Sequence, residues 1–337
     1  MIKKPDIGDF ETIKLLGIGS CGQVYLVKQH DTNCEYAMKV INNKSKRLTS
    51  KALNEQEILI HTCHPFIATS YYCFETDCEL CIIMGYCEFG NFYNFMQKQE
   101  KHCFNEEQTK YYASCILLAL EYLHFIGVIY RDLKPENILV CSSGRIRLSD
   151  FDLSLYEKDK VIMKKFKKPH SHDWGVVSEP NVTMIGLVGT PEYLAPEILE
   201  KKRYTCVIDW WSFGIFIYEM LFDHTPFRHR DTEIMYELIK QCHLVFPHKT
   251  PKGLEISSKA KHLIKNLLKH DPTKRIGFNG GATEIKCDPF FRDVAFQLLF
   301  NQDPPIIPHT DPIESPVIHG ETPRDPLTPH GPLTPSI

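Results

Sequence analysis

The spacing of apolar residues predicts that the chain has two structurally different halves. Between residues 10 and 84, short β-branched runs alternate with polar positions, which predicts strands at 12–16, 25–28 and 36–41. Residues 53–60 repeat apolar side chains at helical spacing, so one helix interrupts these strands. A small antiparallel β-sheet with one helix is therefore the expected structure of this half.

Helical spacing dominates the rest of the chain. Asn105, followed three residues later by Gln108, has the capping-box pattern of a helix start, and an apolar stripe continues from there until Gly127. Two further buried helices are predicted at residues 209–221 and 257–268. The two halves together predict an α+β, bilobal architecture, with a small β-sheet lobe and a larger helical lobe.

Composition divides the chain into five segments. Residues 301–337 hold ten of the 22 prolines and no aromatic residue, so they cannot bury enough apolar area to offset the entropy of ordering. We expect an extended or disordered tail there. The predicted segments are an N-terminal extension at 1–9, a β-rich lobe at 10–84, a hinge at 85–91, a helical lobe at 92–300 and this tail.

Charge and cysteine usage exclude several classes of protein. The net charge of -3 gives no overall attraction to nucleic acid, so we expect no specific nucleic-acid partner. The thirteen cysteines are scattered through apolar runs and no secretory leader follows Met1, which favours reduced thiols in a cytoplasmic protein. Cys78 and Cys81 have the spacing of zinc ligands, but no second such pair follows, so no zinc site is predicted. No apolar run approaches the roughly 20 residues that cross a bilayer.

A glycine cluster lies between the first two predicted strands. It fits the pattern G-x-G-x-x-G-x-V, in which missing side chains let backbone N–H groups approach phosphate oxygens. Glycines of this kind also open Rossmann units, but there a helix follows directly, whereas residues 23–28 continue as strand. The predicted phosphate-contacting residues are Gly17, Ile18, Gly19, Ser20, Cys21, Gly22, Gln23 and Val24.

A lysine stands inside the apolar third strand. Lys39 follows Ala37 and Met38, and a lysine that clamps phosphates needs a carboxylate to hold its ammonium group in place. The next predicted helix supplies two candidates, Glu55 and Glu57. We prefer Glu55 because it places the neighbouring leucines on suitable faces of the helix, and Glu57 remains the alternative.

The densest group of polar residues is the octad YRDLKPEN at 130–137, followed by SDF at 149–151. Phosphoryl transfer requires an oriented hydroxyl, oxygens that hold metal, and positive charge at the transferred group. The octad and the triad supply all three. The predicted roles are orientation or deprotonation of the hydroxyl for Asp132, neutralisation of the γ-phosphoryl group for Lys134, and Mg²⁺ binding for Asn137 and Asp150.

With these motifs the chain resembles the AGC group of eukaryotic protein kinases over nearly all of residues 10–309. Further landmarks are GTPEY at 189–193, APE at 195–197, DWWSFG at 209–214 and KRIG at 274–277. The resemblance implies the bilobal protein kinase fold and Mg²⁺-dependent transfer of the ATP γ-phosphoryl group to serine or threonine of proteins. It also implies that Glu197 pairs with Arg275, that Asp209 holds the catalytic-loop backbone, and that Thr190 contacts Asp132 and Lys134.

The same resemblance implies further contacts for nucleotide and peptide. The nucleotide contacts beyond the glycine cluster are Ala37, Lys39, Met84, Gly85, Cys87, Asn91, Leu139 and Asp150. The peptide contacts are Glu136 and Glu219 for arginine, and Leu187, Thr190, Pro191 and Leu194 around the target residue. Asn91 replaces a glutamate that many relatives use for arginine, so we expect arginine close to the target and a weaker preference farther upstream.

Within the group the chain is most similar to flippase-kinase-like enzymes of fungi and phototropin-like kinases of plants. The motif DFDLS at 150–154, an enlarged activation segment at 150–197 and residues 301–308 carry this resemblance. Asp152 replaces the usual glycine, and an aspartate adopts φ > 0 at a cost of roughly 1 kcal/mol, which predicts a stiffer loop. Gly186 stands where relatives carry a phosphorylated residue, so we expect activity without that mark, with Thr183 as the displaced alternative site.

The activation segment contains a basic insert at residues 158–168 with interleaved apolar residues. We weigh three readings, an anionic lipid contact, a nuclear import contact and a solvated loop. Accordingly the expected location is cytoplasmic, nuclear or peripheral at membranes, and the expected state is a monomer. The alternative to an active enzyme is a pseudokinase-type interaction module. A pseudokinase has normally lost a catalytic residue, whereas this chain retains Lys39, Asp132, Asn137 and Asp150.

Overall fold

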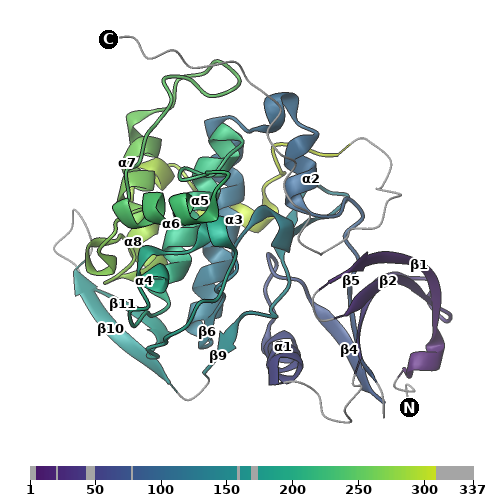
Figure 1. The fold of residues 1–337 in the computed structure, drawn as a ribbon. Coiled ribbons are helices and arrows are strands. Elements are labelled where there is room, and N and C mark those ends of the chain that lie inside the picture. The colour runs from purple at the N-terminus through teal and green to yellow at the C-terminus, as the bar shows by residue number, and fades with distance from the viewer. Residues whose placement is uncertain are drawn as a thin grey trace.

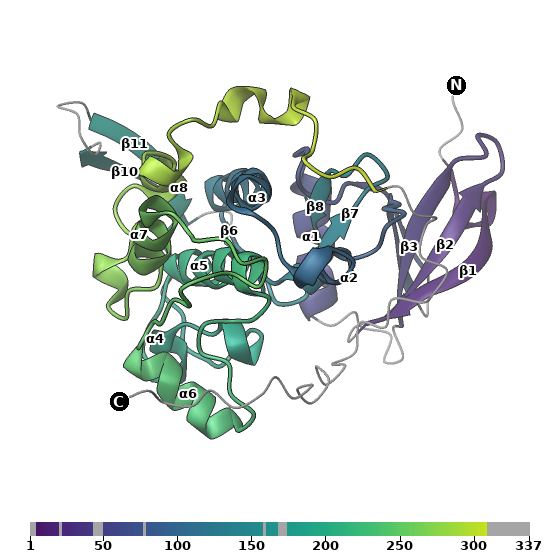
Figure 2. The same ribbon diagram turned by 90° about the horizontal axis from the view of Figure 1, so that it is seen from above.

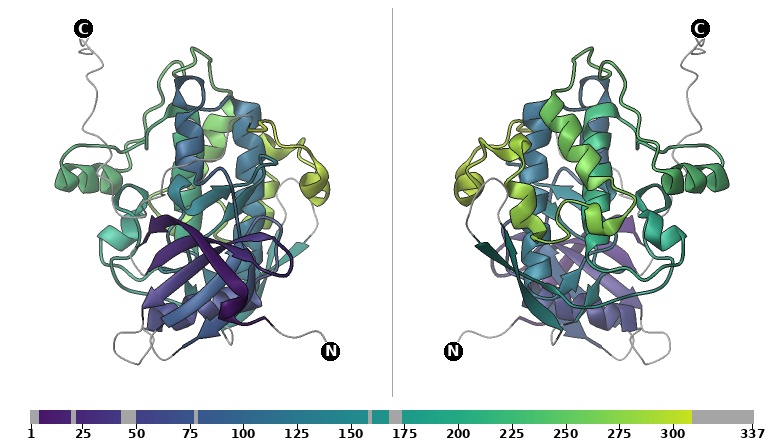
Figure 3. Two further views of the ribbon diagram at one scale, coloured as in Figure 1. Left: turned by 90° about the vertical axis from the view of Figure 1, so that its right-hand side faces the viewer. Right: turned by 90° about the vertical axis from the view of Figure 1, so that its left-hand side faces the viewer.

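The computed structural model describes residues 5–19, 22–42, 50–76, 79–157, 160–167 and 174–308. It has a sheet lobe and a larger helical lobe, as the apolar spacing predicted (Figure 1). In the left view of Figure 3 the sheet lobe (purple) lies in front of the helical lobe (blue to green). Within the described residues, no helix combines the length and the apolar content needed to cross a membrane.

The sheet lobe consists of one antiparallel five-stranded sheet, with strand order β1-β2-β3-β5-β4, and one helix. Its elements are β1 (Phe10–Ile18), β2 (Gln23–Gln29), β3 (Glu35–Asn42), α1 (Ser50–His61), β4 (Ser70–Glu75) and β5 (Glu79–Gly85). A small core within the sheet is formed by Phe10, Val27, Met38, Val40, Cys81 and Ile83. Alternating apolar residues place these side chains on one face of the pleated strands.

The helical lobe is organised around one helix whose residues are all buried, α5 (Val207–Phe222). The other helices are α2 (Phe92–Gln97), α3 (Glu106–Phe125), α4 (Pro196–Leu199), α6 (Thr232–Gln241), α7 (Ser258–Leu267) and α8 (Gly281–Lys286). Short strands are β6 (Val128–Ile129), β7 (Ile138–Val140), β8 (Ile146–Leu148) and β9 (Leu155–Tyr156), which pair as β6-β9 and β7-β8. Helices α3 and α7 pack on α5, and β6, which directly precedes the octad at 130–137, packs on α3.

Short 3-10 turns are the remaining elements of the described residues. They are Ile7–Asp9, Glu100–His102, Pro135–Asn137, Pro191–Tyr193, Pro272–Lys274, Pro289–Phe291 and Phe296–Asn301. Beyond the last turn, residues 302–308 run back over the β7–β8 turn, where a Cβ on Gly144 would lie 2.2 Å from the carbonyl oxygen of Ile306. This part of the predicted tail is therefore packed on the helical lobe, and residues 309–337 lie outside the described residues.

The predicted helices are present in the structure, with ends that differ by one to three residues. The capping box is confirmed: Asn105 Oδ1 accepts from Gln108 N at 2.9 Å, and Gln108 Oε1 accepts from Asn105 N at 3.0 Å. Helix α3 ends at Phe125, and Gly127 follows with φ of 92°. Glycine adopts this left-handed conformation without steric cost, which ends the helix there.

The basic insert forms a β-hairpin rather than a solvated loop in its described part. Strands β10 (Val161–Lys167) and β11 (Trp174–Pro180) pair antiparallel, and β11 packs against α3 and α8 (Figure 2). Phe166 is buried, and a side chain on Gly175 or on Gly280 would collide with its ring. Sequence reasoning missed this packing because the insert is rich in lysine, which suggested a mobile loop. The sequence does not show that Gly175 and Gly280 both leave room for the ring of Phe166.

Candidate active site

The glycine cluster forms a tight turn between β1 and β2. Gly19 N donates to the carbonyl oxygen of Gly22 at 2.8 Å, and a Cβ on Gly22 would lie 2.1 Å from the carbonyl oxygen of Val40. Gly22 is thus required by the close approach of β3. Gln23 and Val24 continue as strand β2, which excludes the Rossmann alternative. Ser20 and Cys21 lie outside the described residues.

Lys39 is held by a buried carboxylate from α1. Its Nζ lies 2.7 and 2.8 Å from the two carboxylate oxygens of Glu55, and both side chains are buried. Glu57 is exposed, so the alternative partner is excluded. The contact brings β3 and α1 together, as the sequence predicted. The reasoning behind that prediction was half wrong, because Leu53 is exposed.

Asp152 is a second partner of Lys39 that sequence reasoning missed. Its Oδ1 lies 2.8 Å from Lys39 Nζ, and Asp150 Oδ1 lies 3.6 Å away. The positive φ expected at Asp152 is found at Asp150 instead, with a value of 54°. Asp152 therefore carries no left-handed strain here, and its side chain ties the activation segment to the lysine of the sheet lobe. The replacement of the usual glycine by Asp152 pointed to a special role for this residue. Its contact with Lys39 could be identified only once the path of the loop was known.

Three carboxylates around one ammonium group leave an excess of negative charge. Burial raises the pKa of Glu55 to about 8, and the carboxylates of Asp152 and Asp150 add to the rise against the opposing Lys39 ammonium. The pKa of Lys39 is also raised, because the attraction of the three carboxylates exceeds the opposing effect of burial. Glu55 is thus able to keep a proton near neutral pH when no nucleotide shares its lysine.

This proton makes a prediction about stability. In protein free of nucleotide and magnesium, the midpoint of thermal unfolding should fall as pH rises from about 5 to about 8. The folded protein holds a proton on Glu55 that the unfolded chain, with the ordinary pKa of 4.5, has released, so only the folded state loses it on this rise. Asp152→Asn removes a carboxylate that raises this pKa, and should flatten the slope measured by calorimetry. The exposed Asp293→Asn is the control, and an unchanged slope in Asp152→Asn would contradict the prediction.

The catalytic loop places a carboxylate, an amine and a hydroxyl within hydrogen-bond distance of one another. Thr190 Oγ1 donates to Asp132 Oδ1 at 2.7 Å, Lys134 Nζ donates to Thr190 Oγ1 at 2.8 Å, and Lys134 Nζ lies 3.0 Å from Asp132 Oδ2. Asn137 Nδ2 donates to Asp132 Oδ2 at 2.7 Å. The contacts of Thr190 with Asp132 and Lys134 are those implied by the resemblance.

The backbone of this loop is fixed by one fully buried carboxylate. Asp209 Oδ2 accepts from Tyr130 N at 2.9 Å and from His124 Nε2 at 2.7 Å, while its Oδ1 accepts from Arg131 N at 2.8 Å. Arg131 has φ of 67°, an uncommon conformation that these bonds hold in place. Asp209 on α5 thereby positions Asp132, as expected.

The residues expected to hold Mg²⁺ fit an oxygen-ligated cation. Asn137 Nδ2 donates to Asp132, which leaves the Oδ1 atom of Asn137 as an acceptor for a cation. The Asp150 side chain is 32% exposed. Carboxylate and amide oxygens are the protein ligands that Mg²⁺ prefers. The carboxylates of Glu55, Asp150 and Asp152 also lie within 4.8 Å of one another, but the ammonium of Lys39 already lies among them.

The predicted nucleotide walls come from the sheet and from β7. Ala37 and Met84 are register partners in β3 and β5, and Leu139 in β7 bridges to Asn91 after the hinge. Asn91 Oδ1 caps α2 by accepting from Asn94 N at 2.9 Å, a role the sequence did not indicate. Gly85 ends β5 where a Cβ would lie 2.9 Å from Nη1 of Arg147, and Cys87 is buried behind it.

The predicted peptide contacts are placed at different depths. Leu187 is exposed and Leu194 is buried, with Thr190 and Pro191 between them at intermediate to exposed positions. Glu219 on α5 is buried and accepts a hydrogen bond from the hydroxyl of Tyr193. Glu136 is half-buried beside the catalytic loop. The structure thus brings Thr190 to Asp132, the predicted catalytic carboxylate, whereas Leu194 and Glu219 are buried rather than on an open surface.

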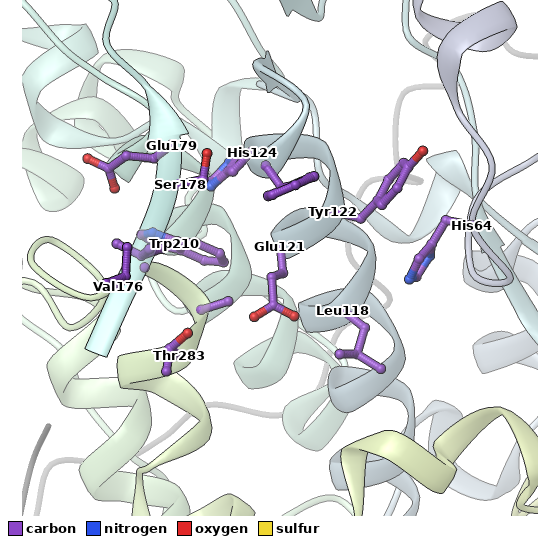
Figure 4. Close-up of a pocket in the computed structure, with 14 residues that line it drawn as sticks. His64, Leu118, Glu121, Tyr122, His124, Val176, Ser178, Glu179, Trp210 and Thr283 are labelled. Atoms are coloured by element: carbon purple, nitrogen blue, oxygen red, sulfur yellow. The ribbon is translucent and has the colours of Figure 1, made fainter. Parts of the chain in front are cut away.

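A separate cavity of about 410 Å³ lies where the hairpin meets the helical lobe (Figure 4). Helix α3 contributes Glu121 and Tyr122, β11 contributes Val176 and Glu179, and Trp210 of α5 lies at its inner side. None of its lining residues belongs to the predicted catalytic or nucleotide set. The cavity is therefore distinct from the site that the motifs define.

Comparison with known proteins agrees with this geometry. The family model described as "Protein kinase domain" matches residues 10–291, so the chain belongs to the protein kinase family. Within that family it is an AGC-type serine/threonine protein kinase, and such a domain uses ATP and Mg²⁺. The resemblance, the kinase fold and the serine/threonine class inferred from the motifs are thereby confirmed.

Three relatives illustrate the match. The chain is 44% identical over 308 residues to Flippase kinase 1 of Saccharomyces cerevisiae, covering 89% of this chain and 34% of that protein. It is 40% identical over 352 residues to Serine/threonine-protein kinase RHS3 of Arabidopsis thaliana, covering 90% of this chain and 70% of that protein. It is 38% identical over 313 residues to Phototropin-2 of Oryza sativa subsp. japonica, covering 90% of this chain and 34% of that protein. The chain thus spans about a third of the yeast and rice proteins.

Proposed function

We propose that this kinase phosphorylates serine or threonine close to arginine, using Asp132, Lys134, Asn137, Asp150 and Lys39 as its catalytic set. The observation that carries the proposal is the triangle of hydrogen bonds joining Asp132, Lys134 and Thr190. A hydroxyl next to Asp132 Oδ1 would be oriented by that carboxylate and lose its proton to it. Lys134 lies where negative charge develops on the transferred group.

Nucleotide binding follows from the remaining residues. Asn137 and Asp150 would hold Mg²⁺, which would neutralise phosphate charge. Lys39 has three donors, all bonded to Glu55 and Asp152, so it would donate to a phosphate in place of one of these contacts while the others hold its ammonium. The glycine turn would offer backbone N–H groups to the phosphates. Arginine recognition is assigned to Glu219 and Glu136, the two residues that the family resemblance implies for it, because a carboxylate matches a guanidinium.

The test is phosphate transfer from radiolabelled Mg-ATP to an arrayed peptide library, run beside Asp150→Ala. Transfer to serine or threonine peptides with arginine near the target, and its loss in the variant, is the expected result. Transfer without an arginine preference would refute the assignment of Glu136 and Glu219. ATP binding without transfer to any peptide would instead favour the pseudokinase module.

We further propose that activity needs no phosphate in the activation segment. Kinase loops are commonly ordered when an arginine pairs with a phosphorylated residue. Here the guanidinium of Arg131 is already bonded, with Nε donating to the Leu153 carbonyl oxygen at 2.6 Å and Nη2 to that of Ser154 at 3.2 Å. Gly186 offers no hydroxyl to modify.

Thr183→Ala is accordingly expected to keep its peptide kinase activity within about twofold. The chain's own carbonyl groups replace the phosphate as acceptors for the guanidinium. The measurement is the initial rate of protein made in bacteria and treated with phosphatase, with Ser178→Ala as the control. Loss of activity when the unmodified chain is treated with phosphatase, together with an inactive Thr183→Ala, would show that this threonine carries a required phosphate.

For the hairpin we propose contact with anionic lipid surfaces. Its outward face carries Met163, 77% exposed, and Trp174, 67% exposed, beside Lys165 and Lys167. Aromatic and apolar groups enter the lipid interface while each lysine near the surface adds about 1 kcal/mol. Lys164 does not take part, because it pairs with Glu179 beneath the hairpin. Lys158 and Lys168 lie outside the described residues.

The hairpin is tested with phosphatidylserine vesicles. The double variant Lys165→Glu with Lys167→Glu should no longer sediment with the vesicles. The control is the double variant Lys98→Glu with Lys101→Glu, which changes two exposed lysines elsewhere and should still sediment with them. Unchanged sedimentation of the first variant would refute the lipid contact. If that variant lost nuclear accumulation of a fluorescent fusion instead, the insert would be a nuclear address.

A further inference from the structure

Two cysteine thiols meet at the hinge between the lobes. Cys87 follows β5 and Cys141 follows β7, and their sulfur atoms lie 3.3 Å apart. Both residues are free thiols, one buried with 7% of its surface exposed and the other half-buried. The distance corresponds to a hydrogen-bonded thiol pair that has not formed a covalent bond.

The backbone around these thiols keeps them in register. Phe89 N donates to the carbonyl oxygen of Val140 at 3.1 Å, and Val140 N donates to that of Gly90 at 2.8 Å. Glu88 Oε2 also accepts from Ser142 N at 2.9 Å. The hinge and the end of β7 therefore run side by side, and the two sulfur atoms face each other from adjacent segments.

The surroundings make the two thiols chemically different. A hydrogen bond from Cys87 lowers the pKa of Cys141, and the guanidinium of Arg147 favours its thiolate further, against the effect of burial. The pKa of Cys87 is raised by the same hydrogen bond and by burial. The more accessible sulfur is thus the better nucleophile, and the buried sulfur is positioned to react with it second.

We propose that Cys87 and Cys141 form a peroxide-sensitive dithiol site that closes to a disulfide and slows phosphoryl transfer. The Cys141 thiolate attacks hydrogen peroxide, takes one oxygen as a sulfenic acid, and hydroxide leaves. The Cys87 sulfur then attacks the sulfenic sulfur, the S–S bond forms, the S–O bond breaks, and the thiol proton leaves with the hydroxyl as water. In total, two thiols and one peroxide become one disulfide and two waters.

The bond affects catalysis through the nucleotide walls. The sulfur atoms must move about 1 Å closer to reach bonding distance. Cys141 lies two residues after Leu139, and Cys87 lies three residues after Met84. Leu139 and Met84 are predicted walls of the nucleotide site. A disulfide would pull these walls together and fix the connection about which the lobes close. Because a displacement of about 1 Å in positioning groups costs up to about 10²-fold, we expect kcat/KM for ATP to fall by about tenfold.

The test treats the full chain with graded hydrogen peroxide. Peptide mass spectrometry should find Cys87 linked to Cys141, kcat/KM for ATP should fall about tenfold, and dithiothreitol should restore both. Cys141→Ser should keep its basal activity and resist peroxide. Cys63→Ser, which removes an exposed cysteine, should remain as sensitive as the unmodified chain.

Three results would overturn the proposal. One is absence of the linked peptide at peroxide doses that oxidise Cys63. Another is linkage with unchanged transfer, and the third is equal loss of activity in Cys141→Ser. The inference rests on the proposed nucleotide walls, but the linked peptide is detected without any activity measurement. Failure of the thiol site and failure of the proposed catalytic set are therefore distinguishable.

Discussion

Replacing Asp132 with asparagine is expected to slow phosphoryl transfer by about 10²–10⁴-fold with little change in ATP affinity. Asp132 accepts from Thr190 through Oδ1, and from Asn137 through Oδ2, which also lies next to Lys134. An amide keeps the size of the side chain but cannot take up the proton of the attacking hydroxyl. It would also point its own donor at one of these groups.

The measurement combines single-turnover transfer with nucleotide affinity by fluorescence. Asp31→Asn, in the exposed turn between β2 and β3, is the matched control and should retain the full rate. A loss below tenfold in Asp132→Asn would mean that the hydroxyl is oriented and deprotonated by another group. An equally large rise in the dissociation constant for ATP would place Asp132 in nucleotide binding instead.

Arg275→Met is expected to lower the free energy of unfolding by about 3–5 kcal/mol. The Arg275 and Glu197 side chains are 0% and 4% exposed, and they form two hydrogen bonds of 2.8 and 3.0 Å. Arg275 also donates to the carbonyl oxygen of Val207 and lies over the ring of Trp211. Removal of the guanidinium leaves the carboxylate charged and buried without its partner, which costs more than the lost bonds alone.

Urea unfolding monitored by tryptophan fluorescence gives the free energy. The exposed Arg203→Met is the control and should change stability by less than about 0.5 kcal/mol. The double variant Glu197→Gln with Arg275→Met should recover part of the loss, because no buried charge remains. A loss below about 1 kcal/mol in Arg275→Met would show that water or another group compensates Glu197.

Local features were predictable wherever neighbouring residues in the sequence are also neighbours in space. The capping box at Asn105 depends on contacts within three residues, and the strand after Gly22 was predicted from its residue types; both are found as expected. The catalytic octad was also readable, because its residue types suit only a narrow range of chemistry. Its contacts with Thr190 and Asp209 came from the family resemblance, since more than fifty residues separate the partners.

Other features escaped the sequence because they depend on which distant segments meet. Asp152 was read as a source of loop strain, but its carboxylate bonds to Lys39 in another lobe. The basic insert was weighed as a loop, but Phe166 finds a site beside Gly280. The cysteines at 87 and 141 look like ordinary buried thiols until the hinge and β7 are seen side by side.

The sequence by itself determined the two-lobed architecture, three strands of the sheet, four of the helices, and the chemistry for which the motifs are suited. These depend on periodicity, capping and residue type, which are local properties. Only the tertiary structure decided the second carboxylate on Lys39, the bonded state of Arg131 and the thiol pair at the hinge. Each joins residues far apart in the chain, and a hydrogen bond forms only when the fold brings its donor and acceptor to within about 3 Å.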